Sequence, residues 1–172
     1  MKKGESGFTF VELMVVVSIF GMIVIVIAAI LSGGRRAWLT SEAQIDVHSS
    51  VRGAMSRITE EIGGAGPGNV SITNISASED NITFRNPISF TSGAVVWSDQ
   101  IQFSLGGLNG QQIVRTNLNT GATDNFGNYI TTLQFAQPAT DIIEVGLVTA
   151  RQSVIGDNLQ MQLTSQVTLR NR

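Results

Sequence analysis

A single carboxylate, Glu12, stands at the start of a long apolar segment. The 19 residues from Leu13 to Leu31 contain no charged side chain, and about 20 apolar residues are enough to cross a bilayer as a helix. A carboxylate at the bilayer centre costs about 2.5–3.5 kcal/mol on insertion scales. Glu12 therefore either lies near the lipid headgroups, where this cost is small, or is neutralised by a cationic partner.

The residue types that carry most enzyme chemistry are few. The chain has no Cys, which excludes thiolate nucleophiles, disulfides and Cys-based metal sites. Both lysines lie at positions 2 and 3, so no Walker A lysine follows the glycine-rich segment 63–68. The only imidazole, His48, falls in an apolar helical pattern, and we expect it to pack against the sheet instead of joining a Ser-His-Asp arrangement. We predict that the protein is not an enzyme and has no cofactor and no small-molecule substrate.

Two pairs of adjacent carboxylates could suggest glycoside hydrolysis. Glu60 and Glu61 are neighbours in a predicted helix, where consecutive side chains point apart. Glu79 and Asp80 are expected in a solvated loop. Neither pair has the facing arrangement that a glycosidase needs.

Oxygen-bearing side chains gather in the segment 117–128, which is rich in Asn, Thr and Gly and is predicted to be an exposed loop. Asn117, Asn119 and Asp124 could bind calcium, but an EF-hand starting at Asn117 needs an acid at its twelfth residue, which is Asn128. A solvated loop is the default interpretation, and calcium binding stays open as the alternative.

The charge balance argues against nucleic acid as a partner. The formal net charge is −2, and only 14% of the residues are charged. Arg151, Arg170 and Arg172 are too few to follow a phosphate backbone unless the fold brings them together.

The elements that position these residues begin with one long helix. We predict it from Phe8 to Ile62, apolar on all sides in its first half and amphipathic in its second. The poor helix formers Gly33 and Gly34 favour a bend between the halves. The expected core stripe of the second half has helical spacing and consists of Trp38, Ile45, His48, Val51, Met55, Ile58 and Ile62.

The helix should end at the glycine-rich segment 63–69, after which the apolar pattern has the period of a strand. Residues 159–169 alternate most clearly. Segments 101–105 and 112–116 predict a hairpin, and further strands are predicted at 70–75, 82–84, 95–97, 131–135 and 142–149. Together these elements predict an α+β fold in which the amphipathic half of the helix packs on an antiparallel sheet.

The segment Glu5-Ser6-Gly7-Phe8-Thr9-Phe10-Val11-Glu12-Leu13, which follows a short basic leader, resembles the type III signal of type IV prepilins and type II secretion pseudopilins. The resemblance implies cleavage between Gly7 and Phe8 by a prepilin peptidase and methylation of the new amine of Phe8. It also implies that Glu12 pairs with the amine of a neighbouring subunit during assembly. Ala29 departs from the family, because many major pilins have a proline there, whereas Gly21 matches a glycine that loosens the stalk helix. A secretory signal peptide, cut near Ser32-Gly33-Gly34, is the alternative.

A narrower resemblance links residues 55–66 and scattered strand segments to PilW-type minor pilins. It implies a structural protein that enters, primes or tips a type IV pilus, with the prepilin peptidase, other pilin subunits and the bacterial inner membrane as partners. The chain would cross that membrane once, with its N-terminus in the cytoplasm, before it moves to a surface pilus. A J-type minor pseudopilin of a periplasmic type II secretion pseudopilus stays open as the alternative.

These expectations divide the chain into four parts. Residues 1–7 are the expected leader peptide, and residues 8–34 form the transmembrane or filament-core helix. Residues 35–62 continue the helix as its amphipathic half. Residues 70–172 form the β-rich, pilin-like head.

Overall fold

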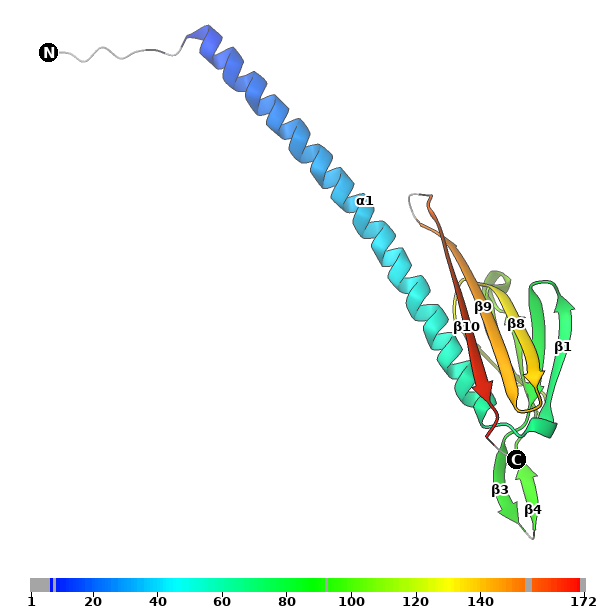
Figure 1. Ribbon diagram of the computed structural model, residues 1–172. Coiled ribbons are helices and arrows are strands. Elements are labelled where there is room, and N and C mark those ends of the chain that lie inside the picture. The colour runs from blue at the N-terminus through cyan, green and yellow to red at the C-terminus, as the bar shows by residue number, and fades with distance from the viewer. Residues whose placement is uncertain (1–6, 8, 92, 154–155, 171–172) are drawn as a thin grey trace.

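One long helix and a β-rich head make up the computed structural model of this protein (Figure 1). The structure describes residues 7, 9–91, 93–153 and 156–170. Helix α1 spans Phe10–Gly63, has 54 residues and runs unbroken through Gly33 and Gly34, where the sequence favours a bend. At 1.5 Å per residue it is about 81 Å long. The head packs against its C-terminal half, and the N-terminal half extends away from the head.

The sheet follows α1 after Gly64 caps the helix and a short 3₁₀ turn spans Pro67–Asn69. The strands are β1 (Val70–Ser76), β2 (Glu79–Phe84), β3 (Pro87–Thr91), β4 (Ala94–Trp97), β5 (Ile101–Gly106), β6 (Gln112–Asn117), β7 (Thr123–Phe126), β8 (Ile130–Ala139), β9 (Ile142–Gln152) and β10 (Asn158–Thr168). The main sheet has the order β10-β9-β8-β2-β5-β6-β7, with β1 paired to β2, and β3 and β4 form a separate hairpin.

This architecture confirms the predicted α+β class with one qualification. The pairing of β2 with β8, at Glu79 and Leu133, is parallel, whereas the other strand pairs are antiparallel. The predicted hairpin of 101–105 with 112–116 is present as β5 and β6, and the alternating segment 159–169 is largely β10.

The core lies between the amphipathic half of α1 and one face of the sheet. Ile58 and Ile62 of the helix are fully buried against a cluster that includes Phe84, Phe103 and Leu147. The rings of Phe84 and Phe103 lie 5.3 Å apart between centroids. The alternation of the predicted strands therefore places their apolar side chains against the helix.

The helix stripe was predicted correctly only in its C-terminal part. Val51, Met55, Ile58 and Ile62 are buried, but Trp38, Ile45 and His48 are exposed. The head first buries the helix at Ala43, beyond Trp38, and continues on Val47, Val51 and Ala54. The buried side chains from Ala43 to Ile62 follow one helical stripe, and Trp38, Ile45 and His48 lie on a neighbouring side of the helix that the head leaves uncovered.

Two predictions about the polar connections were wrong. The expected loop 117–128 contains β7, in which the ring of Phe126 packs at 5.7 Å from that of Phe103 and the guanidinium of Arg57 lies over the Phe126 ring. Glu79 and Asp80 belong to β2 and not to a loop. Strand β3 was not predicted, since Pro87 lacks an amide donor and its segment is mostly exposed.

Candidate functional site

The N-terminal half of α1 presents an apolar surface that the rest of the chain does not cover. Its large apolar side chains from Phe10 to Leu31 are 49–75% exposed. The helix is long and apolar enough to cross a membrane. Soluble proteins rarely expose more than a few hundred Å² of contiguous apolar surface. This half of the helix therefore needs an apolar environment outside the chain, and a bilayer or a bundle of similar helices would supply it.

The carboxylate of Glu12 caps the N-terminal end of this helix together with Thr9. Its Oε2 accepts hydrogen bonds from the backbone N–H of Thr9 at 2.9 Å and from the Thr9 hydroxyl at 2.8 Å. The Glu12 N–H in turn donates to the Thr9 hydroxyl at 3.3 Å. This reciprocal capping box satisfies N–H groups that have no partner inside a helix, and it places the negative charge at the positive end of the helix dipole.

Thr9 was missing from the sequence-based site. The sequence does contain the pattern that predicts its role, because Thr-x-x-Glu before an apolar run is typical of a capping box. The cost of placing the Glu12 charge in a membrane does not by itself predict this local role.

The predicted processing junction lies just before the cap. Gly7 is exposed and precedes the helix, which begins at Phe10. Phe8 lies outside the described residues, as do residues 1–6 of the predicted leader. Gly7 therefore lies outside α1, at the position where the sequence predicts cleavage.

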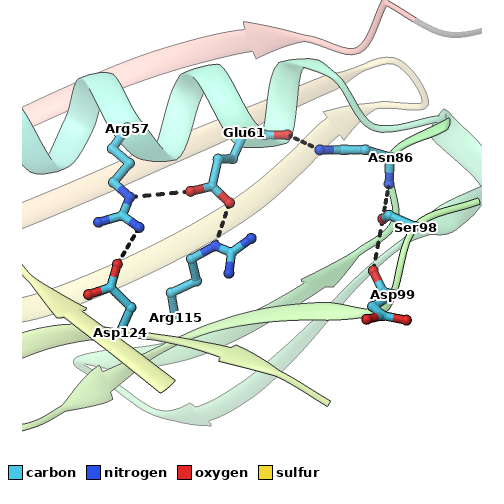
Figure 2. A network of polar contacts seen from close by, with 7 residues as sticks. All are labelled: Arg57, Glu61, Asn86, Ser98, Asp99, Arg115 and Asp124. Atoms are coloured by element: carbon cyan, nitrogen blue, oxygen red, sulfur yellow. Dashed lines mark hydrogen bonds and ion pairs between the residues drawn. The ribbon is translucent and has the colours of Figure 1, made fainter. Parts of the chain in front are cut away.

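A second polar cluster links the C-terminal end of α1 to the head (Figure 2). Glu61 lies between two guanidinium groups, with Oε1 at 3.3 Å from Arg57 Nε and Oε2 at 2.7 Å from Arg115 Nε. Arg57 also bonds Asp124 of β7, and this carboxylate raises the pKa of the guanidinium. Asn86 donates from Nδ2 to the backbone carbonyl of Glu61 at 3.2 Å. The cluster holds the sheet to the helix end, which is a structural role.

We expect Glu61→Ala to lower the free energy of unfolding by about 1–2 kcal/mol, between the values for exposed and buried ion pairs. The Glu61 side chain is only 23% exposed, so its loss leaves two partly buried cations without their shared carboxylate. Urea unfolding of the full chain in detergent measures the change. Glu60→Ala is the matched control, because Glu60 is exposed; an equal loss in both variants would contradict the prediction.

The other predicted chemical residues have structural surroundings. The Oδ1 of Asn117 accepts the backbone N–H groups of Asn119 and Thr120, and Asp124 pairs with Arg57. Asp80 is buried and accepts the N–H of Phe135 at 3.0 Å. Within the described part of the chain, no group of three His, Cys, Asp or Glu side chains could hold a metal ion.

Arg151 and Arg170 lie at opposite ends of β10: Arg151 faces the start of the strand and pairs with Asp46 of α1 at 2.7 Å, whereas Arg170 follows its end. Arg172 lies outside the described residues.

Comparison with known proteins found no matching family model, no matching curated protein and no matching solved structure.

Proposed function

We propose that this protein is a minor pilin, a structural subunit that is cut by a prepilin peptidase and enters, primes or tips a type IV pilus. The observation that carries the proposal is the apolar half of α1 that the rest of the chain leaves uncovered, at the end of the segment Gly7-Phe8-Thr9-Phe10-Val11-Glu12. The peptidase, other pilin subunits and the bacterial inner membrane would be its partners.

The exposed half of α1 supports two successive environments. As a single span it would hold the precursor in the inner membrane, with the basic leader in the cytoplasm. In a filament, the same surface would pack against the helices of neighbouring subunits. The head would then lie outside the membrane, where its surface, rich in Ser, Thr, Asn and Gln, contacts water.

The chain isolated from membranes is expected to begin at Phe8, with one methyl group on its amine. Cleavage removes Lys2, Lys3 and Glu5, which leaves 9 Arg and 12 acidic residues and no Lys. Intact-mass measurement with N-terminal sequencing tests this directly. A chain that begins at Met1 or after Gly34 would overturn the processing step, and Gly7→Ile should accumulate the uncut precursor if the small glycine is needed by the peptidase.

A J-type minor pseudopilin of a type II secretion system is the second candidate, because it requires the same signal and helix. A deletion strain separates the two functions. Loss of surface pili with normal enzyme secretion supports the pilus, whereas the opposite result supports the pseudopilus.

A further inference from the structure

We propose that Arg35 and Arg36 of α1 bind the phosphate groups of phospholipids, in the leaflet that faces the head. This site rests on the membrane span in the proposed function. The 22 residues between Glu12 and Arg35 carry no charge. At 1.5 Å per residue these two side chains start about 35 Å apart along the helix axis. A bilayer has a hydrocarbon core about 30 Å thick and measures about 40–45 Å with its headgroups. With Glu12 at one headgroup layer, the two arginines therefore lie at the other.

Neither guanidinium group has a carboxylate partner in the fold. Arg35 and Arg36 are both exposed, and within the described part of the chain no ion pair includes either of them. A charged side chain on a helix pairs most readily with an opposite charge three or four residues away. For these two arginines such positions lie within 31–33 and 38–40, which hold no acidic residue.

The acidic side chains that follow on this part of the molecule face other groups. Asp46 pairs with Arg151 at 2.7 Å, and this contact, with a smaller contribution from Glu42, raises the pKa of the Arg151 guanidinium. Asp157 accepts the hydroxyl of Thr40 at 3.3 Å. The negative charge that would balance the two arginines therefore has to come from outside the chain.

An uncovered tryptophan lies at the same level of the helix. Trp38 is 73% exposed and follows Arg35 by three residues, so the two side chains share one side of α1. The head first buries the helix at Ala43, so Trp38 lies between the apolar half of α1 and the head (Figure 1). Tryptophan is enriched where a membrane meets water, because its ring is apolar and its N–H is polar. Trp38 is thus a second, independent indication that a headgroup layer surrounds this turn.

Lipid phosphate fits this position better than a second copy of the chain. Two parallel copies at one depth in a membrane would bring Arg35 and Arg36 beside the same two cations, which repel. The carboxylate of Glu12 would lie at the other face of the bilayer. Side chains on an α-helix tilt toward its N-terminus, so both arginines reach back toward the membrane. A guanidinium can donate two parallel hydrogen bonds to one phosphate, which makes the headgroup phosphate the matching anion.

The contact can be measured by solid-state NMR on the full chain, labelled with ¹³C at arginine Cζ, in bilayers of phosphatidylethanolamine and phosphatidylglycerol in a phosphate-free buffer. Lipid ³¹P should dephase about two ninths of the Cζ signal, since the 11 Lys and Arg minus two Lys leave nine arginines. Arg35→Gln with Arg36→Gln should abolish this dephasing. Arg52→Gln is the matched control, because Arg52 is exposed on the same helix about 24 Å beyond Arg36, and it should leave the dephasing unchanged.

Three results would overturn the phosphate site: no dephasing in the native chain, dephasing that persists in the double variant, or an equal loss in Arg52→Gln. Hydrogen exchange of the amides of residues 13–31 in the same bilayers separates this site from the membrane span. Protected amides without dephasing would refute the phosphate site alone, whereas freely exchanging amides would refute the span and the site with it. Neither measurement depends on cleavage at Gly7 or on filament assembly.

Discussion

Ile58→Ala should lower the free energy of unfolding by about 2–5 kcal/mol, the range for a large aliphatic side chain removed from a packed core. Ile58 is fully buried in the middle of the helix–sheet interface. Its truncation removes apolar contacts and leaves a cavity that the sheet can fill only in part, because Phe84 and Phe103 are held by their own neighbours. Urea unfolding of the full chain in detergent, followed by near-ultraviolet circular dichroism, measures the loss.

The matched control for this prediction is Ile45→Ala, the same chemical change at a position of α1 nearer its N-terminus. Ile45 is 67% exposed, so its truncation should change the free energy of unfolding by less than about 0.5 kcal/mol. If the two variants lost equal stability, the helix would not face the sheet through the stripe from Ala43 to Ile62. The pair therefore tests which face of α1 belongs to the core.

The comparison of Ile45 with Ile58 also shows how far the sequence predicts the fold. Periodicity located α1 and most of the strands, because a long apolar run is typical of a helix and strict alternation is typical of a half-buried strand. It could not decide which of two apolar stripes on α1 faces the sheet. That choice depends on which side chains of α1 the folded head covers, from Ala43 to Ile62, and this is a property of the packed structure.

The residues of the candidate site also fall into those that the sequence predicts and those that only the folded structure brings together. Gly7, Phe8 and Glu12 were predicted from a linear pattern, because the chemistry expected there uses residues that are neighbours in the chain. The contacts of Glu61 with Arg115, and of Arg57 with Asp124, join residues 54 and 67 positions apart. No local pattern contains this information.

Two roles of Glu12 have to be separated before its function can be assigned. In the single chain its carboxylate caps α1 through Thr9, which would be its complete role in an ordinary helix. In the proposed filament it would also neutralise the amine of a neighbouring subunit, since an uncompensated charge among apolar helices is strongly unfavourable. Glutamine can replace glutamate in a capping box but carries no charge. Glu12→Gln therefore keeps the cap and removes the proposed pairing.

We expect Glu12→Ala and Glu12→Gln to insert into the membrane normally and both to be incorporated into filaments at least about tenfold less than the native chain, which corresponds to a lost interaction of 1.4 kcal/mol or more. Quantitative immunoblots of sheared filaments and of membranes measure incorporation and insertion. Thr9→Val is the control, since it removes the hydroxyl of the cap and leaves the Glu12 charge, and it should assemble nearly normally. Normal assembly of Glu12→Gln together with failure of Glu12→Ala would reduce the role of Glu12 to capping. If neither Glu12 variant enters filaments but Thr9→Val does, assembly requires the negative charge of Glu12. The glutamine variant retains a side-chain oxygen that can accept the hydrogen bonds of the helix end, so loss of the cap would not explain its failure.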